Sequence, residues 1–341
     1  MKPFQHVWAA NERDAVEAVS RPGVTGRSAI AAPAQFLAGG TTLLDLMKLE
    51  VMRPERLVNI GALRRAASSG IEAGPQGLRL DPLTTMAELA DHPVLQRDYP
   101  LIVDTLTLAA SPQIRNMASL GGNLLQRTRC SYFRDVRWQE CNKRNPGSGC
   151  AARSGINRQH AVLGGSTDCI ATYPGDFAQA LVAFDATVAT LNSRGRRTIP
   201  VADLHRVPGT TPHVETVLAP GELITAIHVP AGPWTRRSRY VKIRDRASFQ
   251  FAVVSAAVAL HLDSGVVREA RIALGGVATT PWRARKAESM LRGCRFDESL
   301  ARTAAEYAFL ESATSSHNAF KVPLGKATVV RALLEAAQMD A

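Results

Sequence analysis

Residues 34–50 read AQFLAGGTTLLDLMKLE, and this stretch decides the fold. It begins with a short apolar run that ends in two glycines, a pattern that predicts a buried strand followed by a turn. Residues 42–50 then carry apolar side chains at helical spacing. Because RLVNI (56–60) predicts another strand, the chain opens with a strand–Gly-Gly–helix–strand unit of the α/β kind.

The C-terminal part has a different character. Residues 251–263 (FAVVSAAVALHLD) and 267–277 (VREARIALGGV) predict two long neighbouring antiparallel strands. The Pro- and Gly-rich stretch VPAGPW (229–234) precedes them and predicts a domain boundary. Helices are expected after the strands, near residues 284–292, 297–310 and 326–339.

Composition is that of a folded globular protein with more than one domain, since the 341 residues are 45% hydrophobic and 21% charged. No apolar run reaches the roughly 20 residues that a membrane-spanning helix needs. The N-terminus shows neither an apolar signal core nor a twin arginine, so we expect no export signal of its own. The net charge of +11 comes largely from clusters scattered over the second half, which favours solvated strand edges over a nucleic-acid interface.

Two glycine pairs carry the first chemistry, in LAGGTT (37–42) and SLGGNLL (119–125). We expect each pair where a strand ends, because glycine permits a positive φ and a close approach of the backbone to a ligand. Consecutive N–H groups can then converge on a phosphate. Either pair alone is also explained by a tight turn, and neither is a dinucleotide fingerprint or a Walker loop. Two such segments in one chain favour a single extended diphosphate held from both ends.

Five motifs occur in order over most of the chain. They are FLAGGTTLLDLMK (36–48), RPERLVNI (53–60), SPQIRNMASLGGNLLQ (111–126), PGDFAQALVAFDATV (174–188) and KIRDRASFQFAVVSAAVAL (242–260). Together they resemble the FAD-binding medium subunit of molybdenum hydroxylases, the family of xanthine dehydrogenase and carbon monoxide dehydrogenase. Thr42 is a departure, since the family more often has Asp or Asn there, but a hydroxyl can also donate to a phosphate.

The resemblance implies an α+β fold. A vanillyl-alcohol-oxidase-type (PCMH-type) FAD-binding domain of two subdomains would be followed by a C-terminal domain of antiparallel sheet and helices. On this basis we expect the first subdomain in residues 1–60, the second in residues 61–232 and the C-terminal domain in residues 233–341.

The resemblance also assigns residues to FAD. The first glycine segment would hold the diphosphate through Ala38, Gly39, Gly40, Thr41 and Thr42. The second segment and the residues before it would add Ser111, Ile114, Ser119, Gly121, Gly122 and Asn123. Asp176 would lie near the ribityl–adenosine part and Lys242 near the isoalloxazine ring, where a cation raises the flavin potential. The alternative for Lys242 is a solvated strand residue.

Four of the five cysteines lie close together, with the spacing C-x10-C-x8-C-x18-C: Cys130, Cys141, Cys150 and Cys169. Zinc ribbons normally show two cysteines within a short knuckle, and this segment has none. A [4Fe–4S] cluster wants four soft ligands and tolerates irregular spacing, and NPGSGC (145–150) supplies small residues that can bend around it. Spacing alone favours the cluster and leaves two disulfides, a zinc site and unliganded thiols as alternatives.

The resemblance sharpens the cluster interpretation. Residues 126–170 look like the insertion found in the periplasmic aldehyde oxidoreductase subgroup, whose FAD subunits carry an additional [4Fe–4S] cluster. The four clustered cysteines would then be its ligands. We expect a loop role, or a contact behind the ligands, for His160, and a buried structural thiol at Cys294.

The resemblance implies an electron-transfer subunit of a molybdenum-dependent aldehyde oxidoreductase. Its partners would be a large molybdenum-cofactor subunit, a small subunit with two [2Fe–2S] clusters, and an external electron acceptor, without nucleic acid. Periplasmic residence by co-export with a partner is expected, with the cytoplasm as the alternative. A stand-alone FAD-dependent oxidoreductase and a zinc-containing nucleic-acid-binding protein are the rival classes.

Overall fold

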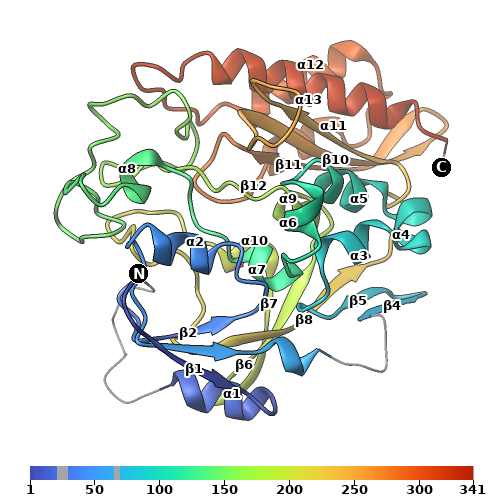
Figure 1. The fold of residues 1–341 in the computed structure, drawn as a ribbon. Coiled ribbons are helices and arrows are strands. Elements are labelled where there is room, and N and C mark those ends of the chain that lie inside the picture. Colours follow the sequence, from blue (N-terminus) through green and yellow to red (C-terminus); the bar gives the residue numbers. More distant parts are fainter. Residues whose placement is uncertain (21–29, 65–69, 341) are drawn as a thin grey trace.

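The computed structural model describes residues 1–20, 30–64 and 70–340. The strands of these residues form three sheets, which follow one another along the chain (Figure 1). The α+β fold expected from the motifs is confirmed, and the helices lie between and around the sheets.

The first sheet is parallel, in the order β1-β3-β2. Its elements are β1 (Gln5–Trp8), α1 (Glu12–Val19), β2 (Ala34–Leu37), α2 (Leu43–Lys48) and β3 (Arg56–Asn59), followed by a 3-10 turn at Gly61–Leu63. The predicted strand–Gly-Gly–helix–strand unit is therefore present. A parallel pair needs a connection that crosses over, and α2 with its flanking loops supplies it between β2 and β3.

The second sheet is antiparallel, in the order β4-β5-β8-β6-β7. Its strands are β4 (Ile71–Gly74), β5 (Gly77–Leu80), β6 (Thr187–Asn192), β7 (Gly195–Pro200) and β8 (Leu223–Pro230). Its helices are α3 (Met86–Ala90), α4 (Pro93–Asp98), α5 (Pro100–Thr107), α6 (Pro112–Arg115), α7 (Leu120–Leu124), α9 (Phe177–Ala183) and α10 (Val201–Leu204). A capping box at Thr85 and Glu88 starts α3.

The second glycine pair lies inside α7 and not at the end of a strand, which corrects the expectation from sequence. Ser119 is the N-cap, and its Oγ accepts a hydrogen bond from the backbone N–H of Gly122 at 3.2 Å. This bond satisfies one of the N–H groups that a helix start leaves free, so the segment is helical despite its two glycines.

The third sheet is antiparallel, in the order β12-β11-β10-β9. Its elements are β9 (Ser238–Ile243), β10 (Val254–Asp263), β11 (Val266–Gly275), β12 (Trp282–Arg283), α11 (Arg285–Leu291), α12 (Glu298–Ala308) and α13 (Lys321–Ala337). The two long predicted strands are thus confirmed as β10 and β11. Helices α5 and α9 pack against this sheet as well as α11 and α13, and the middle of β10 is fully buried. Because β10 is covered on both faces, its sequence is an apolar run without the alternation of a half-buried strand.

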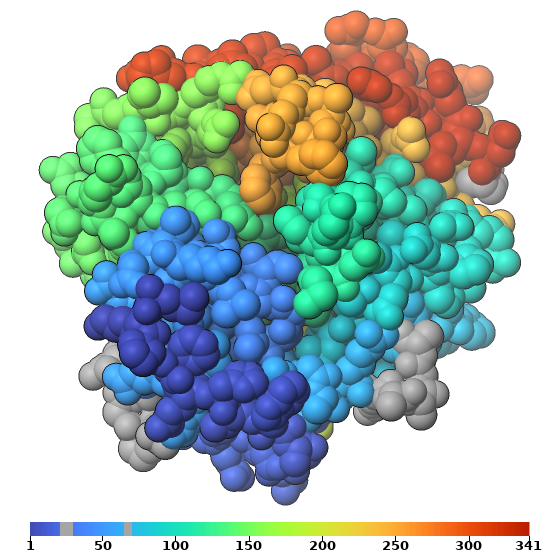
Figure 2. All heavy atoms as spheres, viewed as in Figure 1, coloured from blue at the N-terminus to red at the C-terminus, as the bar shows by residue number. Residues whose placement is uncertain are grey.

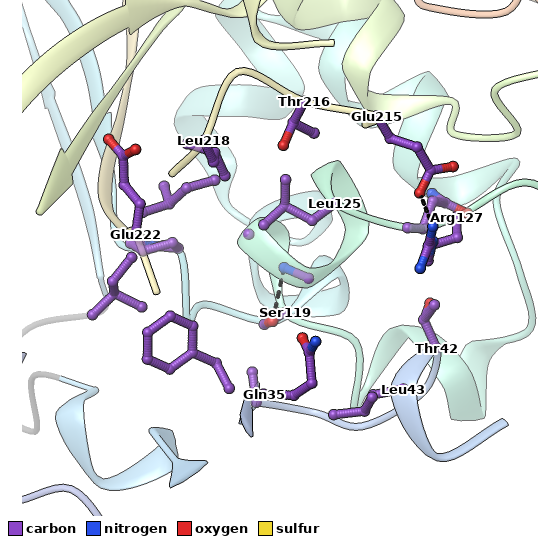
Figure 3. A pocket seen from close by; sticks show the side chains of 18 of the residues that line it. Gln35, Thr42, Leu43, Ser119, Leu125, Arg127, Glu215, Thr216, Leu218 and Glu222 are labelled. Carbon is purple, nitrogen blue, oxygen red and sulfur yellow. Dashed lines mark hydrogen bonds and ion pairs between the residues drawn. The ribbon is translucent and has the colours of Figure 1, made fainter. Parts of the chain in front are cut away.

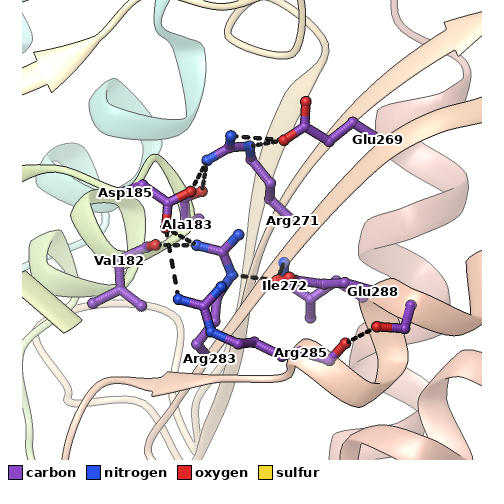
Figure 4. A network of polar contacts seen from close by, with 10 residues as sticks. Val182, Ala183, Asp185, Glu269, Arg271, Ile272, Arg283, Arg285 and Glu288 are labelled. Carbon is purple, nitrogen blue, oxygen red and sulfur yellow. Dashed lines mark hydrogen bonds and ion pairs between the residues drawn. The ribbon is translucent and has the colours of Figure 1, made fainter. Parts of the chain in front are cut away.

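An arginine network joins α9 to the third sheet (Figure 4). Asp185, just beyond α9, accepts hydrogen bonds from Arg271 on β11 and from Arg283 on β12. Arg283 also donates to the carboxylate of Glu288 and to the carbonyl of Val182. The second and third sheets are therefore connected by paired charges in addition to apolar packing.

The cysteine segment (residues 126–170) has little regular structure apart from α8 (Ser131–Arg134). It is nevertheless packed against α2: Phe133 is fully buried in one apolar cluster with Leu46 and Met47. Arg129 and Arg134 both donate to the carboxylate of Asp45. In Figures 1 and 2 the segment is green and lies against the blue N-terminal subdomain. It is more than a loop excursion, because it shares a core with that subdomain.

Candidate cofactor-binding pocket and thiol cavity

A cavity of about 540 Å³ lies where the two glycine segments meet (Figure 3). The segment at residues 213–222 and the start of β8 close another side of it. The sequence-predicted residues that line the cavity are Ala38, Gly39, Gly40, Thr41, Thr42, Ser119, Gly121 and Gly122. The volume is within the range of small-molecule and cofactor sites.

The first glycine segment has the backbone that an anion site needs. Gly40 has a φ of 74°, a conformation that favours glycine. A Cβ at Gly39 would lie 1.8 Å from the carbonyl oxygen of Met117, so only glycine fits where the two segments cross. Among the described residues, none accepts a hydrogen bond from the N–H groups of residues 39–42. These N–H groups are therefore available to a ligand.

The second glycine segment differs, because its N–H groups already have partners. Gly121 donates to the carbonyl of Pro82 at 2.8 Å, and Asn123 donates to the carbonyl of Ser119 at 2.8 Å. Gly122 donates to the Ser119 hydroxyl, as described for the helix cap. A Cβ at Gly121 would approach Pro82 to 3.0 Å. The glycines here permit close packing, and the segment offers a ligand fewer free donors than its sequence suggests.

The remaining predicted flavin residues do not line this cavity. Asp176 and Lys242 form a buried ion pair at 2.7 Å, with side chains 4% and 1% exposed. Ser111 is the N-cap of α6, and Ile114 is exposed on that short helix. Asn123 lies beside the cavity, and its Oδ1 is buried without a hydrogen-bond partner among the described residues. The assignment of these five residues to FAD stays a prediction.

Sequence reasoning assigned no charged residue to the cavity wall, and three of those that line it interact with one another: Arg127, Lys143 and Glu215. Glu215 forms ion pairs with Arg127 and, at 2.9 Å, with Lys143. Burial raises the pKa of Glu215, but the two cations outweigh it and the pKa is lowered. The carboxylate therefore stays ionised. In sequence the partners are far apart, and none of them belongs to a motif.

The four clustered thiols line one small second cavity, together with Lys143 and Ala171, which also line the larger one. Burial raises the pKa of each thiol, that of Cys130 to about 12. The backbone N–H of Ala171 donates to the sulfur of Cys169 at 3.5 Å, and backbone N–H groups near the other three sulfurs partly offset the effect of burial on their pKa values. The Nε2 atom of His160 lies 3.2 Å from the sulfur of Cys130, which places this histidine directly behind the thiols.

No disulfide joins the five cysteines. Within residues 1–20, 30–64 and 70–340, no three His, Cys, Asp or Glu side chains are arranged to hold a single metal ion. The prediction of a buried structural thiol at Cys294 is wrong: this residue is exposed in the turn after α11, because the residue type only biases burial and does not determine it.

The three sheets and the glycine-lined pocket agree with the fold that the motifs imply, a two-subdomain FAD-binding domain followed by a domain of sheet and helices. The family described as "FAD binding domain in molybdopterin dehydrogenase" matches residues 2–232. The family described as "CO dehydrogenase flavoprotein C-terminal domain" matches residues 239–336. The chain therefore belongs to the FAD-binding medium-subunit family of molybdenum hydroxylases, which are oxidoreductases. The subdomain boundaries stay a prediction.

Relatives and solved structures agree over nearly the whole chain. The aldehyde oxidoreductase FAD-binding subunit PaoB of Escherichia coli (strain K12) is 44% identical over 322 residues, which cover 94% of this chain and 97% of the relative. The carbon monoxide dehydrogenase medium chain of Hydrogenophaga pseudoflava is 27% identical over 86% of this chain and 82% of its own length. The solved carbon monoxide dehydrogenase from that organism shares the fold, with a TM-score of 0.73 and 24% identity over 98% of both chains.

Among the described residues, no helix is both long and apolar enough to cross a bilayer.

Proposed function

We propose that this chain is the FAD- and [4Fe–4S]-containing electron-transfer subunit of a molybdenum-dependent aldehyde oxidoreductase. The observation that carries the proposal is the pair of adjoining cavities, one lined by both glycine segments and the other by four thiols. The similarity to a subunit of an aldehyde oxidoreductase supports the substrate class. We assign no residue of the cavity walls to aldehyde binding and place the oxidation of the substrate in a partner subunit.

The residues fit FAD. The free N–H groups of residues 39–42 suit the diphosphate, and the apolar part of the pocket, including Phe36 and Leu218, suits a ring system. When bound, FAD supplies the capacity to exchange electrons singly or in pairs. The chain's own residues bind it, orient it and exclude water from it.

The support for the iron–sulfur cluster is the donor set, since four cysteine thiols that line one cavity are the ligands of [4Fe–4S]. The cavity has a volume of about 10 Å³, so the segment would have to open to admit the cluster. The backbone N–H of Ala171, which donates to Cys169, is of the kind that tunes such clusters. Cys130, Cys141, Cys150 and Cys169 would be the ligands. Bound thiolates are deprotonated, so the raised thiol pKa values describe the metal-free protein.

The chain would work as one subunit of an assembly. A large molybdenum-cofactor subunit and a small subunit with two [2Fe–2S] clusters would deliver electrons to this chain, which passes them to an external acceptor. The relatives are named as subunits or medium chains, which supports an assembly with partners. We further propose periplasmic residence by co-export, which cell fractionation of the native host tests directly: recovery with its partners in the cytoplasm contradicts it.

The proposal is tested on the native complex. We expect flavin absorbance, about four irons and about four acid-labile sulfides per chain beyond those of the partner clusters, and a native mass well above that of this chain alone. A monomeric yellow protein without iron supports the alternative, a stand-alone FAD-dependent oxidoreductase. A colourless protein contradicts both.

A further inference from the structure

Arg127 is a buried cation that no predicted flavin contact accounts for. Its side chain is 7% exposed and lines the larger cavity (Figure 3). Its Nε and Nη1 atoms are buried and have no hydrogen-bond partner among the described residues. A guanidinium presents five donors in a fixed planar fork, and leaving them unsatisfied in the interior costs free energy. The geometry therefore calls for an acceptor inside the cavity.

The position of Arg127 is fixed by two neighbours. Glu215 pairs with the guanidinium from the segment before β8, and the ring of Phe133 lies 5.2 Å from its central carbon. Lys143 holds Glu215 in turn, at 2.9 Å, and donates a hydrogen bond to the carbonyl of Pro212 at 3.0 Å. The fork is thus held in place before any ligand arrives, which lowers the entropy that binding must overcome.

The charge of this group points to an anion. Arg127 and Lys143 carry two positive charges against the one negative charge of Glu215. Lys143 also lines the thiol cavity, so Arg127 is the cation of the triad that lines the larger cavity alone. Buried charges are stabilised by compensation from an opposite charge. On the other wall, residues 39–42 present free N–H groups, whereas those of residues 121–123 are already used. An anion between the first glycine segment and Arg127 would accept hydrogen bonds from the free N–H groups of residues 39–42 and from the guanidinium.

We propose that Arg127 binds the diphosphate of FAD, and that Glu215 and Lys143 are positioning residues that hold it there. This inference rests on the proposed function for the identity of the ligand. It makes the cysteine segment a contributor to the flavin site, since Arg127 and Lys143 both belong to residues 126–170. The second glycine segment then shapes the pocket, while Arg127 supplies the charge opposite the first segment.

The test compares ADP with adenosine, which differ only in the diphosphate, and measures FAD beside them. The full-length chain is freed of flavin and titrated with FAD, ADP and adenosine. Removing the charged hydrogen bonds in Arg127→Gln should weaken FAD and ADP about 10- to 100-fold and leave adenosine within about twofold. Arg127→Lys keeps the charge without the fork and should fall between Gln and the wild type. The matched control is Arg137→Gln, in the same segment, whose side chain is 88% exposed.

Several outcomes overturn the inference. Equal weakening of ADP and adenosine, or loss of iron together with FAD in Arg127→Gln, indicates a structural role for the arginine. Unchanged ADP affinity shows that the guanidinium does not reach the phosphates. If Arg127→Gln fails to fold, the same ADP-against-adenosine comparison in Arg127→Lys decides. A wild-type chain that binds neither FAD nor ADP refutes the proposed function itself, which separates that failure from a failure of the Arg127 assignment.

Discussion

The ammonium of Lys242 donates a hydrogen bond to the carboxylate of Asp176 at 2.7 Å, and both side chains are almost completely buried. The other carboxylate oxygen accepts from the Tyr240 hydroxyl at 2.5 Å, and Lys242 also donates to the carbonyl of Leu108 at 2.9 Å. Two residues that the resemblance assigns to different parts of FAD are thus direct partners. They join β9 of the third sheet to the start of α9, one of the helices described with the second sheet.

Lys242→Met should destabilise the protein strongly, because it leaves the Asp176 carboxylate buried without its cation. Breaking one side of a buried pair costs about 3–5 kcal/mol of unfolding free energy. Chemical denaturation measures this change in unfolding free energy. The double variant Lys242→Met/Asp176→Asn should recover part of the loss, since no charge is then left unpaired. If the double variant loses as much as the sum of the single variants, the two side chains do not interact as described.

Gly39→Ala should disturb the crossing of the two glycine segments. The added methyl group would lie 1.8 Å from the Met117 carbonyl oxygen, so the backbone must shift. We expect a loss of about 1–3 kcal/mol in stability and a fall in bound FAD, measured by absorbance after gel filtration. Gly74→Ala is the matched control, because an added Cβ there meets no heavy atom within 4 Å. Equal behaviour of the two variants would contradict the close approach.

The sequence predicted the first glycine segment well for a physical reason. Each glycine of this segment meets a requirement of the backbone: at Gly39 the backbone of Met117 comes too close for a Cβ, and Gly40 has a positive φ. Such requirements are local, so the sequence can indicate them. The strands β10 and β11 were predictable because their long apolar runs admit few other structures. The second glycine pair lies in a helix because Ser119 is its N-cap, a helix-start residue, whereas two glycines within five residues argue against a helix.

Arg127 was not predictable, because its role depends on residues brought together only by the fold. Glu215 lies far along the chain from both of its cations, and each of the three reads in sequence as an ordinary surface charge. The same holds for the packing of Phe133 against α2, which turns a presumed excursion into part of a core. Composition and spacing carry no information on such long-range contacts.

His205 should contribute to a loss of stability in mild acid. Burial lowers its pKa from 6.5 to about 4, and its Nε2 atom lies 3.0 Å from the carbonyl of Leu124. Between these two values the unfolded chain binds a proton that the folded chain does not, so stability falls as the pH drops from about 6.5 to 4. Thermal unfolding of His205→Gln at several pH values should show a shallower fall than the wild type. His160, whose pKa burial also lowers to about 4, titrates in both proteins, so the difference between them isolates His205.

Cys141→Ser should remove the iron–sulfur cluster and spare most of the flavin. Serine replaces a soft thiolate by a hard, protonated oxygen that binds iron poorly. Iron content should drop well below about four per chain, and residues 126–170 should become sensitive to protease, because cluster binding contributes folding free energy to the segment that it ties down.

Flavin should survive in that variant for a structural reason. Arg127 precedes the first thiol, and Phe133 packs this end of the segment on Leu46 and Met47. Lys143 lies in the part that loosens, but it only positions Glu215, so we expect FAD to bind more weakly without being lost. Cys294→Ser is the control, since that thiol is exposed and lies outside the cavity, and it should keep iron and FAD alike.

Gly122→Val should do the reverse of Cys141→Ser, because an added Cβ meets the Ser119 hydroxyl at 2.9 Å and disturbs the flavin side alone. Retention of about four irons in Cys141→Ser would refute the ligand assignment, whereas joint loss of iron and FAD would show that the thiol cavity and the flavin pocket fold as one unit.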